Sequence, residues 1–155
     1  FKRRFRAGEA QFDAQMVDYA YLVRGVLDLY KATGDEAYLN YATQFTDKQI
    51  ELFYDKDNGG FYDTGQEENN LLIRTKEFFD SARPSGNSVA VSNLVRLAEL
   101  TDNKKYVAKV QESIRYFGKY LNESPAAMPE MLQALHVYFN TYQASRGPNS
   151  GDSSN

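Results

Sequence analysis

The chain has 155 residues, of which 42% are hydrophobic and 25% charged, and its formal net charge at pH 7 is −3. This length and composition indicate one soluble globular domain. Four of the 18 basic residues lie within the first six positions, which leaves 14 basic against 21 acidic side chains in the rest. Such an acidic body argues against a nucleic-acid-binding groove. The basic segment 1–12 is either a solvated end or a contact for an acidic surface.

Several classes of site are excluded by the residue types present. The chain has no cysteine and one histidine, so disulfides and thiolate metal sites are excluded, and we expect no metal. Glycine-rich nucleotide loops are absent, and no cofactor is expected. The segment 55–63 has some features of a calcium loop, but its twelfth position is Gln66 instead of glutamate. Without a signal peptide or a long apolar stretch, we expect a cytoplasmic chain that does not contact membranes. Because it begins without Met, we expect a fragment or a processed product.

Apolar residues recur every three or four positions in most of the chain, which predicts amphipathic helices. Gly34 is suited to a left-handed helix end, and Asp35 begins the next helix. Pro129 fits the first turn of the last helix. The predicted helices cover about 13–31, 35–53, 88–100, 104–121 and 129–142.

Two short segments depart from this period. Residues 60–64 and 71–75 are rich in aromatic and branched side chains, and they follow the turn signal Asn58-Gly59-Gly60. They predict a small β-hairpin or an extended excursion between the second and third helices. The end of the chain, 144–155, is rich in Gly, Ser and Asn and is expected to be disordered. The helical domain is therefore placed at 13–143.

An internal repeat relates the two helix pairs. With a shift of 68 residues, "LDLYKATGDEAYL" from Leu27 aligns with "VRLAELTDNKKYV" from Val95. Each unit is a helix, a polar turn and a second helix. Repeated helix pairs indicate a solenoid or a toroid, because one pair cannot bury its own apolar face. The last helix then begins a third pair and lacks its partner.

Three motifs occur in a particular order: "VDYAYLVRGVLDLYKATGDEAYL", "LFYDKDNGGFYDT" and "LLIRTKEFFDSARPSGNSVAVSNLVRLAELT". The chain thereby resembles the C-terminal region of the spermatogenesis-associated, thioredoxin-like protein family. In that family a thioredoxin-like domain precedes an (α/α)6 toroid, which is similar to six-hairpin glycosidases and N-acylglucosamine 2-epimerases. The resemblance implies an all-α fold that forms part of a toroid, with loops and helix starts lining a central cavity. One departure is Ser81, where the family has glycine.

The segment 80–87, "DSARPSGN", enters the third helix. Pro84 restricts the backbone, Gly86 permits an unusual conformation, and Ser85 or Asn87 can cap the helix. A turn and cap explain these residues but not Asp80 and Arg83. In a toroid, the polar groups Asp80, Arg83, Ser85 and Asn87 would face the cavity and suit the hydroxyls of a sugar. The two interpretations are compatible.

Further polar candidates lie in two other places. The resemblance puts Asp18 and Tyr19 at the same cavity end, with Asp18 a general base or a hydroxyl acceptor. A carboxylate near a helix start is also favourable without function. Arg74 and Lys76 share a face of an extended segment, where Asp63 would join them over the cavity or form an ordinary ion pair.

The function expected is carbohydrate-active or sugar-binding, with a small sugar as ligand. Asp18 and Asp80 are the carboxylates that glycoside hydrolysis would require. The single histidine, His136, is expected to be packed within its helix, which weakens an epimerase interpretation. The alternative is a non-catalytic scaffold that associates with a thioredoxin-like domain or with itself.

Overall fold

A computed structural model describes residues 1–65 and 74–142 of the chain. Helices make up most of this part, which confirms the all-α class. The helices are α1 (Met16–Thr33), α2 (Glu36–Phe53), α3 (Gly86–Thr101), α4 (Lys104–Glu123) and α5 (Pro129–Tyr142), with the short 3-10 helix η1 (Pro125–Ala127) before α5. No helix in the described ranges combines the length and hydrophobicity that a bilayer crossing requires.

Polar side chains determine where the helices begin. The carboxylate of Asp35 accepts a hydrogen bond from the Ala37 amide at 2.9 Å, and Asn103 caps α4 in the same way. Ser85 is the N-cap of α3, one of the two residues predicted for that role. Gly34 ends α1 in the left-handed region, with φ 69°. These local signals explain why the helix bounds lie within three residues of those predicted.

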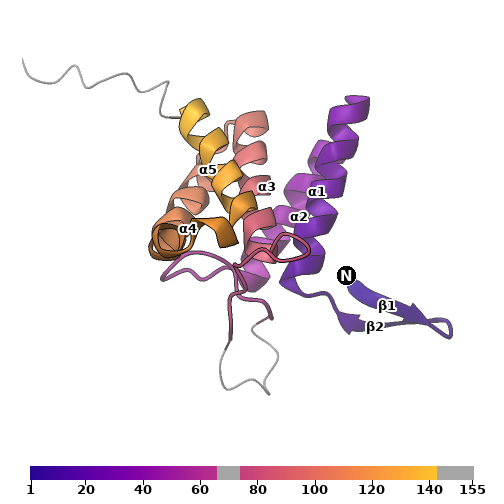
Figure 1. Ribbon diagram of the computed structural model, residues 1–155. Coiled ribbons are helices and arrows are strands. Elements are labelled where there is room, and N and C mark those ends of the chain that lie inside the picture. Colours follow the sequence, from indigo (N-terminus) through magenta and orange to yellow (C-terminus); the bar gives the residue numbers. More distant parts are fainter. Residues whose placement is uncertain (66–73, 143–155) are drawn as a thin grey trace, which may run out of the picture.

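The helices form two antiparallel pairs, and one helix of each pair lies in a common row with α5. α1 packs against α2, and α3 packs against α4. α3 also contacts both α1 and α5, so these three lie side by side with α3 in the middle (Figure 1). All three begin at the same end of the molecule, where the connection between α2 and α3 lies (Figure 1). Eleven of the 16 residues of α3 are buried, which makes it the centre of the core.

The β-hairpin lies at the N-terminus and not between the second and third helices. β1 (Lys2–Arg6) pairs antiparallel with β2 (Glu9–Asp13). Ala7 and Gly8 join the strands, and both have positive φ, 52° and 82°, as a tight two-residue turn requires. The basic segment 1–12 is therefore largely a strand pair, and all the residues of the two strands are exposed.

In the connection between α2 and α3, the described residues contain one isolated bridge, Tyr54 to Phe61, and no strand. Residues 60–64 form no strand, although the Asp63 amide donates to the Thr75 carbonyl at 2.9 Å and so links the two predicted segments. Most of the second predicted strand, 71–75, lies outside the described residues, as does the segment 144–155.

Candidate functional site

Asp80 joins the starts of α3 and α5. One carboxylate oxygen accepts a hydrogen bond from the Ser85 amide at 2.8 Å, and the other accepts from the Glu130 amide at 2.9 Å. Its own amide donates to the carbonyl of Ala127. Both oxygens are thus engaged by backbone donors, as is typical of a carboxylate that organises a connection.

Asn87 and Ser85 are also engaged within the protein. The Asn87 oxygen accepts from the Phe61 amide at 2.7 Å, and its NH2 group donates to the carbonyls of Phe61 and Glu77. The Ser85 hydroxyl accepts from the Ser88 amide. Both residues are buried, so they hold the connection onto α3. Gly86 serves this packing too: an added Cβ would lie 2.7 Å from the Met16 side chain, so its role is close approach and not an unusual conformation.

Asp63 and Arg74 bind backbone within the same connection. The Asp63 carboxylate accepts from the Glu77 amide and from the hydroxyl of Thr75. The Arg74 guanidinium donates to the Thr64 carbonyl and lies 4.0 Å from the centre of the Tyr62 ring.

Lys76 forms a buried ion pair, with Asp55 instead of Asp63. The ammonium lies 2.8 Å from the Asp55 carboxylate, and the two side chains are only 4% and 5% exposed. It also donates to the Gly59 carbonyl and lies 3.7 Å from the Tyr116 ring centre.

The surroundings of Asp55 favour its ionised form. Burial opposes ionisation, but hydrogen bonds from Lys76, Asn58 and Tyr62 outweigh burial and hold the pKa of the Asp55 carboxyl well below its usual range. The same carboxylate folds the turn that follows, because it accepts from the amides of Asp57 and Asn58. This ion pair therefore anchors the connection against α4.

An open groove lies at the start of α1, beside β1. Asp18, Tyr21, Arg3 and Arg83 line it, and its volume is about 610 Å³. The Asp18 carboxylate accepts from the Gln15 amide at 2.8 Å and lies 3.3 Å from the Arg3 guanidinium. The Arg83 guanidinium lies 5.7 Å from the Tyr21 ring centre, and the Tyr21 hydroxyl donates to the Pro84 carbonyl.

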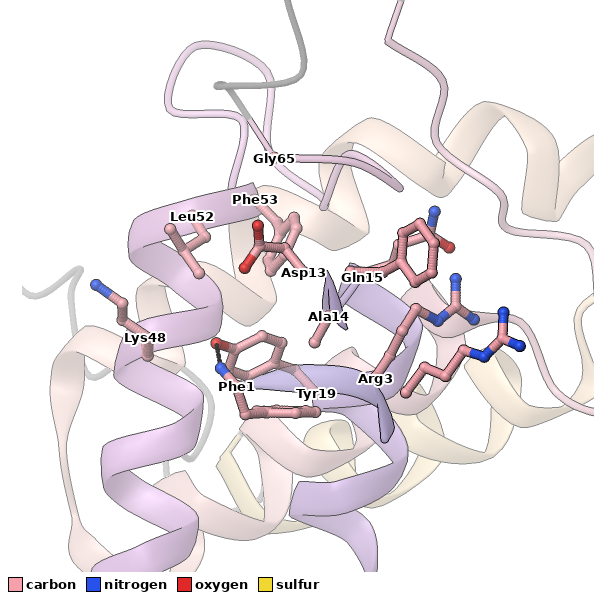
Figure 2. A pocket seen from close by; sticks show the side chains of 12 residues that line it. Phe1, Arg3, Asp13, Ala14, Gln15, Tyr19, Lys48, Leu52, Phe53 and Gly65 are labelled. Carbon is pink, nitrogen blue, oxygen red and sulfur yellow. Dashed lines mark hydrogen bonds between the residues drawn. The ribbon is translucent and has the colours of Figure 1, made fainter. Parts of the chain in front are cut away.

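An adjacent pocket of about 1000 Å³ is lined by aromatic rings (Figure 2). The centre of the Tyr19 ring lies 4.5 Å from that of Phe1 and 5.6 Å from that of Phe53. Burial raises the pKa of the Tyr19 hydroxyl. Arg3 extends on one side of the rings and Lys48 lies on the other (Figure 2). The groove and the pocket share Phe1 and Arg3, so they form one hollowed region.

Comparison with known proteins identifies relatives but no matching family model. Spermatogenesis-associated protein 20 of Homo sapiens and that of Rattus norvegicus are each 40% identical to the chain over 119 residues, 76% of its length. The chain is homologous to spermatogenesis-associated protein 20. An uncharacterized protein of Caenorhabditis elegans is 33% identical over 129 residues, 83% of the chain. The matches span only 15% to 17% of the length of these relatives.

In this homologue of spermatogenesis-associated protein 20, the nine residues predicted from sequence fall into two groups. Asp18, Tyr19 and Arg83 line the hollowed region at the start of α1. The other six make internal contacts that hold the connection between α2 and α3: Asp63, Arg74, Lys76, Asp80, Ser85 and Asn87.

Sequence reasoning missed residues in both groups. Asp55 pairs with Lys76 and accepts a hydrogen bond from Tyr62, and Arg3 and Tyr21 line the groove. The run Asp55–Gly60 is a turn signal. An aspartate that begins such a run commonly accepts hydrogen bonds from the amides that follow it, and this pattern could have identified Asp55. His136 was expected to be packed, but it is exposed on α5, where its ring lies 3.0 Å from the Asn140 amide.

Proposed function

We propose that the chain is one segment of an (α/α) toroid, and that the end where α1, α3 and α5 begin binds a small polyhydroxylated ligand of the sugar type. Three side-by-side helices with a common start, two of them paired with antiparallel helices, match the inner and outer helices of such a ring. The relatives are several times longer than the chain, so they have room for the remaining pairs.

The observation that carries the proposal is the open groove with its aromatic neighbour. Asp18 offers an acceptor for hydroxyl groups, and Arg83 offers several donors. The rings of Phe1 and Tyr19 offer an apolar surface for the C–H face of a sugar. Ligand sites commonly combine a mostly apolar wall with a few polar groups of this kind.

Ligand binding is better supported than glycoside hydrolysis. Hydrolysis needs two carboxyl groups that reach the scissile bond. Of the pair Asp18 and Asp80, the second has both oxygens engaged by backbone amides, at 2.8 and 2.9 Å. A carboxylate whose two oxygens are both engaged by backbone amides has little hydrogen-bonding capacity left for a substrate.

The test is calorimetry of the chain with glucose, N-acetylglucosamine and cellobiose. We expect millimolar binding that Asp18→Asn weakens about tenfold, since a lost charged hydrogen bond costs 1.4 kcal/mol or more. Asp57→Asn is the matched control, because Asp57 is exposed and distant along the chain in the turn after Asp55. Absence of heat at about 10 mM ligand, or equal binding by Asp18→Asn, contradicts the proposal.

A second candidate function is a non-catalytic scaffold, favoured by the outer face of α5. Leu132 and Phe139, seven positions apart on one face of this helix, are each 39% exposed. Within the described residues, α5 packs on α3 and lacks the antiparallel partner that α1 and α3 have. On this proposal the face contacts a second copy or a thioredoxin-like domain. Light scattering would then give a mass that rises with concentration, and a constant monomer mass would contradict self-association.

A further inference from the structure

Positive charge is concentrated at the end of the molecule where α1 begins, although the chain as a whole is acidic. The groove is lined by three cations and one carboxylate: Lys2, Arg3 and Arg83 against Asp18. The adjacent pocket repeats this ratio, with Arg3, Arg4 and Lys48 against Asp13. Lys48 is paired with Glu51 at 2.7 Å, so the excess of cations in this chain of net charge −3 lies mainly on the side of the arginines. Such an excess raises the local concentration of anions.

Arg83 carries the uncompensated charge of the groove. Lys2 lies 2.7 Å from the Asp13 carboxylate, and Arg3 lies 3.3 Å from that of Asp18. By contrast, within residues 1–65 and 74–142 the Arg83 guanidinium makes no ion pair or hydrogen bond, and it lies 5.7 Å from the centre of the Tyr21 ring.

The backbone beside Arg83 is anchored to α1. The Tyr21 hydroxyl donates to the carbonyl of Pro84 at 2.9 Å, which fixes the backbone directly after Arg83 to α1. An exposed guanidinium on an anchored backbone keeps its planar set of donors available. That set matches the two oxygens of a carboxylate or phosphate.

We infer that this groove binds the anionic group of an acidic sugar, either a sugar phosphate or a uronic acid, through Arg83. Arg3 neutralises Asp18, while the remaining oxygen capacity of Asp18 accepts a ligand hydroxyl. The inference rests on the proposed sugar-binding function and names its substrate class. It also explains why an exposed arginine follows the carboxylate that anchors the connection, Asp80.

Calorimetry with glucose, glucose 6-phosphate, glucuronate and inorganic phosphate tests the inference. We expect at least one of the two anionic sugars to bind about tenfold more tightly than glucose. Arg83→Gln removes this preference, and Arg83→Lys keeps part of it because the charge remains. The control is Arg115→Gln, an exposed arginine on α4, which leaves the preference unchanged. Raising salt from about 0.05 to 0.5 M weakens binding of the anionic sugar and not of glucose.

The outcomes separate the two proposals. Equal affinity for glucose and both anionic sugars, unaltered by Arg83→Gln, overturns the inference and leaves sugar binding intact. If inorganic phosphate binds as tightly as glucose 6-phosphate and glucose does not bind, the anion site stands and the sugar proposal fails. If none of the four probes binds, both are overturned.

Discussion

Single polar residues in the connection between α2 and α3 contribute strongly to the stability of the fold. The Lys76–Asp55 pair is the clearest case. Both side chains are about 95% buried. Lys76→Met leaves the Asp55 carboxylate buried without its partner, so we expect the free energy of unfolding to fall by about 3 to 5 kcal/mol in urea titrations. Lys105→Met is the matched control: Lys105 pairs with Asp47 at 3.0 Å, but both side chains are about half exposed. It should cost less than about 1 kcal/mol, and equal losses for the two variants would contradict this account.

The same pair predicts how stability changes with pH. The pKa of Asp55 is lower in the folded chain than in the unfolded chain, so its contribution is complete above its ordinary pKa near 4. This contribution is lost as the pH falls below that value toward the folded-state pKa. The double variant Asp55→Asn with Lys76→Met lacks the titrating group. Its thermal midpoint should therefore fall less than that of the unaltered chain between about pH 5 and pH 2. Parallel acid profiles would show that Asp55 does not contribute.

Among the elements, the N-terminal hairpin should open without unfolding the helices. All ten residues of β1 and β2 are exposed, and an isolated two-stranded hairpin is marginally stable. Gly8 has φ 82°, a conformation that a β-branched residue rarely adopts. Gly8→Val should open the hairpin, as read from the chemical shifts of residues 2–13, with the thermal midpoint of the helices unchanged. Ala7→Gly, which relieves a positive φ, should preserve it. Hairpin shifts that persist in Gly8→Val would refute this prediction.

The elements also differ in how far sequence alone could predict them. Helix bounds were predictable because their signals are local: Gly34 ends one helix, and Asp35 and Asn103 cap others. The hairpin turn Ala7-Gly8 was equally local, but the basic composition of this segment concealed it. The partner of Lys76 was not predictable, because the pair forms 21 positions apart across turns that α3 and α4 hold in place only in the folded chain. For the same reason, a polar residue such as Asn87 resembles a ligand contact until its buried partners are known.

At the scale of the whole molecule, α3 should be the last element to open. It contacts α1, α4 and α5, and most of its residues are buried, whereas α2, α4 and α5 each contact fewer helices. Local opening free energies follow such differences in burial, so the slowest native-state hydrogen exchange should occur in α3 and the fastest helical exchange in α2, α4 or α5.

Two leucine-to-alanine variants test whether the central position of α3 also determines the stability of the whole chain. Leu94 in α3 is 1% exposed and Leu29 in α1 is 46% exposed. Leu94→Ala should therefore cost about 2 to 5 kcal/mol through the cavity that it leaves, and Leu29→Ala much less. If exchange were slowest in α2, α4 or α5, or if the two alanine variants lost equal stability, the central position of α3 would not control unfolding. The row of α1, α3 and α5 that supports the toroid proposal would then not be held together by its middle helix.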